Sequence, residues 1–118
     1  MMAFPASVRI FLWRGATDLR RSYDALSAMV SEYMKEDPLS GHLFVFCNRR
    51  RTQVKVLYWD RDGFAVWQKR LERGTFRIPP GLAESRQELP MAEFHCLLEG
   101  IVPRRQHRRW SPPAQKTS

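Results

Sequence analysis

The sequence predicts an α+β fold, in which an antiparallel sheet of four to five strands packs on one long helix, followed by a short C-terminal helix and a disordered basic tail. Apolar residues recur at helical spacing over 17–35, and short apolar runs separated by turn residues follow between positions 43 and 78. Apolar periodicity ends near residue 102. Because 118 residues suit one core, we expect a single domain over 1–102 and a flexible tail over 103–118.

The N-terminal third predicts a strand and then the long helix. Val8–Trp13 is an apolar run too short to span a bilayer, and Gly15 ends it. Thr17 or Asp18 is a suitable N-cap for a helix that runs to Lys35. The apolar stripe that we expect to pack on the sheet consists of Leu19, Tyr23, Leu26, Val30, Tyr33 and Met34.

The middle of the chain predicts consecutive antiparallel strands. Leu43–Cys47, Gln53–Trp59 and Phe64–Leu71 are apolar runs, and Thr75–Ile78 is a weaker candidate. Asp62-Gly63 is a strong hairpin signal, and none of the connections is long enough for a crossover helix.

A hairpin centred on Asp62-Gly63 places apolar residues on both faces of its strands, so we expect cover on both sides. One face carries Val54, Val56, Tyr58, Ala65, Trp67, Lys69 and Leu71, and the other carries Lys55, Leu57, Trp59, Phe64, Val66, Gln68 and Arg70. In this register Lys55 lies opposite Arg70, a like-charge pair that predicts a bound phosphate or a neutralising acid such as Asp60 or Glu72.

The C-terminal third predicts a polar loop over 79–89 and a short helix over Met91–Glu99. Pro90 suits the first turn of this helix, and Gly100 suits its end. The tail that follows has charge but no apolar periodicity, as is typical of a disordered arm that orders on nucleic acid.

The formal net charge of +8 is distributed unevenly. Residues 1–48 are neutral, whereas residues 49–77 hold nine basic against three acidic side chains. Sixteen of the twenty basic residues are arginine, whose guanidinium binds phosphate with two hydrogen bonds and stacks on bases. This concentration of charge predicts a polyanionic partner. A solvated basic surface, or a G+C-rich genome that favours arginine codons, is the simpler alternative.

The candidate nucleic-acid-binding residues lie at a hairpin tip, around the third central strand and in the tail. They are Arg49, Arg50, Arg51, Lys55, Lys69, Arg70, Arg73, Arg104, Arg105, Arg108 and Arg109. Trp59, Trp67 and Trp110 are candidates for base stacking or for a protein interface.

Three motifs in the centre of the chain resemble one known family. They are Ser40–Phe46, Lys55–Leu57 before Trp59-Asp60, and Lys69–Gly74. Together they resemble the accessory protein of insertion-sequence-66-type bacterial transposons, usually labelled TnpB, which is distinct from the RNA-guided nuclease of the same label.

The resemblance extends over residues 8–105. Gly15–Arg20 resembles the family's N-terminal motif, and Leu97–Ile101 resembles its closing helix. Two segments depart from the family pattern: the turn Asn48–Arg51 replaces a glycine-richer version, and Thr75–Pro80 is looser than usual.

The resemblance implies an auxiliary role in DNA transposition, beside a separate transposase that performs the strand chemistry. The expected partners are transposon-end DNA, the transposase and other transposon-encoded proteins. From the charge distribution we expect binding of the phosphate backbone through the basic hairpin and tail. A protein-bridging subunit or homodimer that uses an aromatic sheet face stays open as an alternative.

A second alternative is a metal-dependent nuclease in which Asp37 and Lys55 converge, although this acid-and-lysine pattern is a weak motif. Otherwise the sequence predicts no enzyme, with no catalytic residue, metal site or cofactor, because the histidines lack zinc-ligand spacing and the glycines are isolated. Cys47 and Cys96 form no CxxC pair, which favours a reduced, cytoplasmic setting, and no membrane partner is expected.

Overall fold

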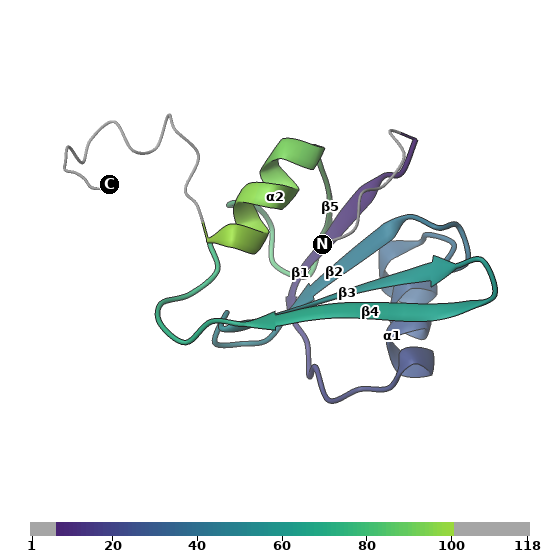
Figure 1. Ribbon diagram of the computed structural model, residues 1–118, viewed down its shortest axis with the longest axis horizontal. Coiled ribbons are helices and arrows are strands. Elements are labelled where there is room, and N and C mark those ends of the chain that lie inside the picture. The colour runs from purple at the N-terminus through teal and green to yellow at the C-terminus, as the bar shows by residue number, and fades with distance from the viewer. Residues whose placement is uncertain (1–6, 101–118) are drawn as a thin grey trace.

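One mixed five-stranded sheet organises the protein, whose computed structural model describes residues 7–100 (Figure 1). In chain order the elements are β1 (Ile10–Ala16), α1 (Tyr23–Met29), the π-helical η1 (Val30–Met34), β2 (Leu43–Cys47), β3 (Gln53–Asp60), β4 (Gly63–Arg70), β5 (Arg86–Leu89) and α2 (Met91–Glu99). The strand order is β4-β3-β2-β1-β5. The predicted α+β class is therefore confirmed, with five strands.

The sheet is not fully antiparallel, so that part of the prediction is wrong. β1 and β2 run parallel, whereas β1–β5, β2–β3 and β3–β4 are antiparallel. The chain crosses over through α1 and η1 between β1 and β2, and such a crossover is what parallel neighbours require.

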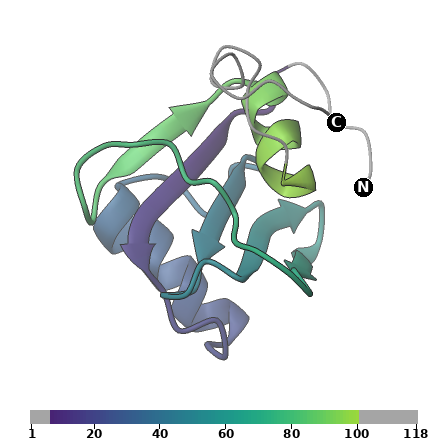
Figure 2. The same cartoon turned by 90° about the vertical axis from the view of Figure 1, so that its left-hand side faces the viewer.

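The helices cover opposite faces of the sheet, as the two apolar faces of the hairpin predicted (Figures 1 and 2). Alternate residues of the central strand β2 point to opposite sides: Phe44 and Phe46 join the α1 cluster, and Leu43 and Val45 join the α2 cluster. All five residues of β2 are buried, but none of the eight residues of β4 is. Burial thus decreases from the centre of the sheet to the β4 edge.

The first helical segment is shorter than the predicted Thr17–Lys35 helix and begins later. The Asp18 carboxylate accepts the Arg20 backbone N–H at 3.0 Å, a local turn that competes with helix formation. Ser22 is the N-cap instead, and its hydroxyl accepts the Ala25 N–H. The last turn widens into η1 and ends at Lys35, whose φ is 59°.

The hairpin register also differs from the prediction. Asp60 pairs with Gly63, so the turn consists of Arg61 and Asp62, and every cross-strand partner moves by two residues. Because the shift is even, both predicted faces are confirmed. Lys55 lies opposite Gln68 and not opposite Arg70, so the predicted like-charge pair is wrong.

The C-terminal part contains one strand that the sequence did not predict. Residues 75–78 form no strand, whereas Arg86–Leu89, within the expected loop, pairs with β1 as β5. The α2 bounds are confirmed, with Pro90 as the N-cap residue and Gly100 as the left-handed C-cap at φ 74°. No helix within 7–100 is both long and apolar enough to cross a bilayer.

A pair of leucine substitutions tests the position of the core. Leu43 is 0% exposed and Leu82 is 80% exposed. Leu43→Ala should lower the free energy of unfolding by about 2–5 kcal/mol, because it removes buried methyl groups and leaves a cavity. Leu82→Ala should change it by less than about 0.5 kcal/mol. Urea denaturation measures both, and equal losses would contradict the arrangement of the sheet.

Candidate nucleic-acid interface

Three adjoining hollows follow the α1 side of the sheet near β3 and β4, and we call them together the basic groove. They share Leu19 and Gln53 at one junction and Lys55 and Gln68 at the other. The basic residues that line the groove are Arg20, Arg21, Arg49, Arg50, Lys55, Lys69 and Arg70, although the Lys69 ammonium itself is directed to the Leu98 carbonyl of α2. Asp18 is the one acidic residue among the lining residues of these three hollows.

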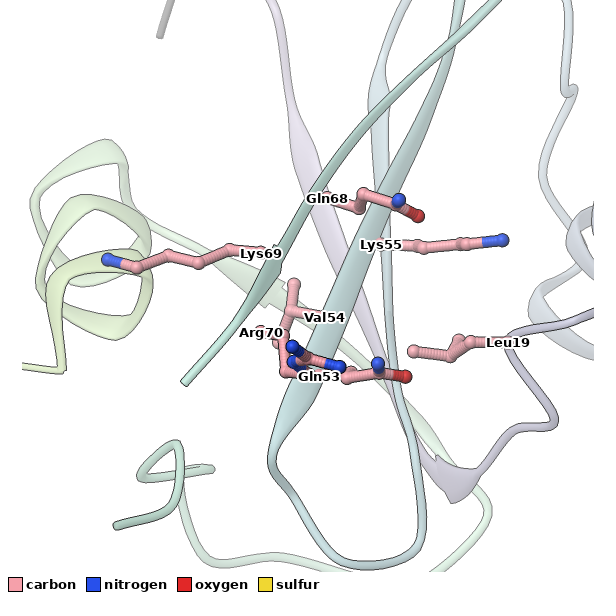
Figure 3. A pocket seen from close by; sticks show the side chains of 7 residues that line it. All are labelled: Leu19, Gln53, Val54, Lys55, Gln68, Lys69 and Arg70. Carbon is pink, nitrogen blue, oxygen red and sulfur yellow. The ribbon is translucent and has the colours of Figure 1, made fainter. Parts of the chain in front are cut away.

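Lys55 lies at the centre of the groove. Its side chain extends from β3 on the same side as those of Gln68 and Leu19, as Figure 3 shows. Arg21, which precedes the N-cap of α1, lines the same hollow as Lys55. Within residues 7–100 neither cation has a carboxylate within ion-pair distance. Positive charge therefore accumulates between α1 and the β3–β4 hairpin.

The turn that presents Arg49 and Arg50 is held by Asn48. The Asn48 amide oxygen accepts the N–H groups of Thr52 at 2.9 Å and Gln53 at 3.0 Å. Arg51 adopts φ 60° in this turn, a conformation that glycine adopts more readily. Arg49 and Arg50 are exposed, and no carboxylate of the described chain pairs with them.

Asp18 is held by one neighbouring arginine. Its two oxygens accept hydrogen bonds from the Arg20 Nε and Nη2 atoms, each at 3.0 Å. These bonds and the Arg20 backbone N–H lower the pKa of Asp18 to about 2. Asp18 is therefore charged at neutral pH and cancels part of the positive charge at this end of the groove.

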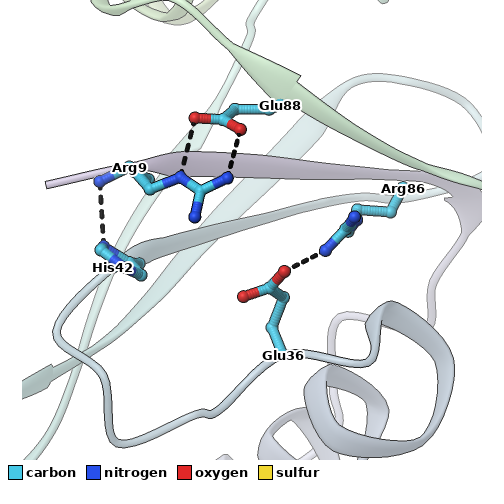
Figure 4. Close-up of polar contacts among 5 residues, drawn as sticks. All are labelled: Arg9, Glu36, His42, Arg86 and Glu88. Carbon is cyan, nitrogen blue, oxygen red and sulfur yellow. Dashed lines mark hydrogen bonds and ion pairs between the residues drawn. The ribbon is translucent and has the colours of Figure 1, made fainter.

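Two arginines near the opposite edge of the sheet, Arg9 and Arg86, are paired with glutamates (Figure 4). Arg9 donates two hydrogen bonds to Glu88, which lowers the pKa of that carboxyl. Arg86 forms an ion pair with Glu36. Both guanidinium groups also lie over the Phe11 ring, at 5.0 and 5.2 Å. Arg9 and Arg86 are thus neutralised by glutamates, unlike Arg21, Arg49, Arg50 and Lys55 of the groove.

The two predicted DNA-binding cations of β4, Lys69 and Arg70, point to opposite faces of the sheet. The Lys69 ammonium donates to the Leu98 carbonyl at 2.8 Å, near the C-terminus of α2, and its side chain points away from Lys55 (Figure 3). Arg70 lines the groove and lies 3.6 Å from Glu72, both groups being well exposed. Arg73 is exposed in the loop after β4 and lines none of the three hollows.

The predicted aromatic residues lie outside the groove. Trp59 packs edge-on against Phe64, with ring centroids 5.1 Å apart, and Trp67 packs against the α2 cluster. Tyr23, 50% exposed, is the aromatic side chain that lines the groove. The tail candidates, which are Arg104, Arg105, Arg108, Arg109 and Trp110, lie outside the described residues.

Sequence reasoning missed Arg20, Arg21 and Tyr23 as groove residues. The predicted helix placed Arg20 along its flank and Tyr23 in its apolar stripe, whereas the chain reaches Ser22 before the helix begins. Ser22 was the signal in the sequence that could have placed the start of the helix correctly, because serine is a strong N-cap residue.

Asp37, the carboxylate proposed for a nuclease site, serves local structure. The Asp37 carboxylate accepts the Leu39 N–H at 2.9 Å in the turn after η1. Asp37 lines neither of the two hollows that Lys55 lines. Within residues 7–100 no three His, Cys, Asp or Glu side chains gather in a possible metal site.

Comparison with known proteins places the chain among transposon-encoded proteins. Residues 8–108 match the family model described as IS66 Orf2 like protein. The chain belongs to this family, which is associated with transposition. No solved structure matches it.

Two relatives come from Sinorhizobium fredii (strain NBRC 101917 / NGR234), and both are described as uncharacterized. Protein y4hO is 34% identical over 112 residues, covering 95% of this chain and 96% of the relative. Protein y4jC is 32% identical over 94 residues, covering 80% of each chain.

Asn48→Ala tests how the Arg49–Arg50 turn is held. The substitution leaves two part-buried N–H groups without their acceptor, so we expect the free energy of unfolding to fall by about 1–3 kcal/mol. The control Arg50→Ala, in the same turn but exposed, should change it by less than about 0.5 kcal/mol. Chemical denaturation distinguishes them, and an equally mild effect of both would show that Asn48 does not hold the turn.

Proposed function

We propose that this protein is a non-catalytic accessory factor of transposition that binds the phosphate backbone of transposon-end DNA through the basic groove. The observation that carries the proposal is the position of Arg21, Arg49, Arg50 and Lys55. These four cations line adjoining hollows, and no carboxylate of residues 7–100 pairs with them.

Phosphate is the ligand that this chemistry suits. Cations without protein partners attract counterions, and a polyanion that displaces those counterions binds with a favourable entropy of release. The guanidinium groups of Arg49 and Arg50 add bidentate hydrogen bonding, and exposed Tyr23 adds a surface for contact with sugar or base. The cations lie in three hollows that adjoin through shared lining residues, an arrangement that offers positions for several phosphates of a backbone.

We assign the strand chemistry to a separate transposase. Two of the carboxylates have local roles: Asp18, in the groove, binds Arg20, and Asp37, which lines none of the three hollows, caps the turn after η1. Family membership supports a partnership with other transposon-encoded proteins. In this proposal the groove positions DNA for those proteins.

The central prediction concerns the salt dependence of DNA binding. Lys55→Gln should weaken binding to transposon-end DNA and reduce the slope of log K against log salt by about 0.9, because one phosphate contact is lost. The control Arg61→Gln removes one positive charge at the hairpin tip, outside the groove, and should leave the slope unchanged. Electrophoretic shifts across a salt series measure both. Equal slopes for the two variants would reject the groove as the binding surface.

Removing the acidic residue of the groove should strengthen binding. Asp18 is ionised at neutral pH because its pKa is about 2, so Asp18→Asn raises the net positive charge of the groove by one and releases Arg20. We expect affinity for DNA at low salt to rise roughly 2- to 5-fold, the range expected for one exposed charge pair. The control Asp24→Asn, on α1 but outside the groove, should have a smaller effect. Weaker binding by Asp18→Asn would contradict the proposal.

A further inference from the structure

Among the residues that the structure describes, no other strand pairs with the outer edge of β4. On its inner side β4 pairs with β3. The Leu71 N–H donates to the Thr52 carbonyl, so odd-numbered residues direct their backbone groups toward β3. The N–H and C=O groups of Phe64, Val66, Gln68 and Arg70 therefore point outward.

The opposite edge of the sheet is short and charged, whereas the β4 edge is long and largely apolar. β5 has four residues, of which Arg86 and Glu88 are exposed, and Pro90 follows it directly. β4 has eight residues without proline, and its first five are partly buried apolar residues or glycine. Lysines commonly protect exposed edges, but Lys69 is bonded to α2. A long apolar edge without such protection is a template for another strand.

We propose that β4 pairs antiparallel with β4 of a second copy of this chain, about a two-fold axis at Val66. A two-fold axis between two edges must be perpendicular to the sheet, so paired residues lie on the same face and have numbers of the same parity. Two registers give the longest overlap, with the axis at Val66 or at Trp67. Both direct the free backbone groups of the two strands toward each other.

Charge and size favour the axis at Val66. That register brings Arg70 beside Asp62, the turn residue that precedes β4 of the other copy, and places Trp67 opposite Ala65, which brings opposite charges together and pairs a large with a small side chain. The register with its axis at Trp67 places Asp62 opposite Glu72 and two tryptophans against each other. The apolar residues Phe64 and Val66, which pack at the margin of the α1 cluster, would gain cover from the second copy.

The dimer would place both basic grooves on the same side of a ten-stranded sheet, because the axis is perpendicular to that sheet. This consequence rests on the proposed DNA-binding function, whereas the pairing of β4 does not. Dimerisation is therefore tested without DNA, so that its failure and the failure of DNA binding are distinguishable.

Sedimentation equilibrium of the full chain over a concentration series tests the pairing. We expect a reversible dimer that Val66→Pro abolishes, because proline removes an outward N–H and leaves the bonds to β3 intact. Circular dichroism and thermal unfolding establish that this variant is folded. A monomer at every concentration, or a dimer that a folded Val66→Pro variant still forms, would overturn the proposal.

A charge exchange gives a second test that keeps the strand sequence from 63 to 69 intact. Asp62→Arg and Arg70→Asp should each weaken dimerisation by about 2- to 30-fold, since two exposed pairs are lost per dimer. The double variant restores opposite charges across the axis and should recover the affinity of the original chain. Failure of the double variant to recover it would overturn the register.

Discussion

The structure depends on one constraint: the sheet has two apolar faces, but its helices cover only part of them. α1 and η1 bury the Phe44, Phe46 and Leu57 side of the sheet, and α2 buries the opposite side. Cover decreases toward β4, where no residue is fully buried. Lys55, Gln68 and Arg70 occupy the α1 side of this margin, where long polar side chains keep their charged ends in water. The basic groove is the polar border of an incompletely covered sheet.

The distribution of charge follows from the same arrangement. Near β1 and β5, Arg9 and Arg86 are close to Glu88 and Glu36 and form ion pairs with them. At the β3–β4 side, the turn after β2 and the approach to α1 bring cations together from segments about thirty residues apart, with Asp18 as the acidic residue among them. A sequence window shows the excess of charge over residues 49–77, but it cannot show that Arg20 and Arg21 lie beside that segment.

Elements fixed by local chemistry were predictable from the sequence. The α2 bounds follow from Pro90 and Gly100, and the bounds of β2 follow from an apolar run between turns. The errors arose where local signals compete. Both Asp18 and Ser22 are good N-caps, and the Asp18 carboxylate forms a turn with Arg20 instead of capping. β5 is a short, mostly polar strand defined by its pairing with β1, so no apolar periodicity reveals it.

The most direct test of the account is a map of the DNA-binding surface by amide chemical-shift perturbation, using isotopically labelled full-length protein and a transposon-end duplex. The account predicts that shifts concentrate in the three segments that contribute the groove's lining residues, which are 17–23, 48–55 and 66–70, and are small in β5 and in α2. Perturbations that concentrate in β5 or α2 and leave Arg21, Arg49 and Lys55 unaffected would contradict it.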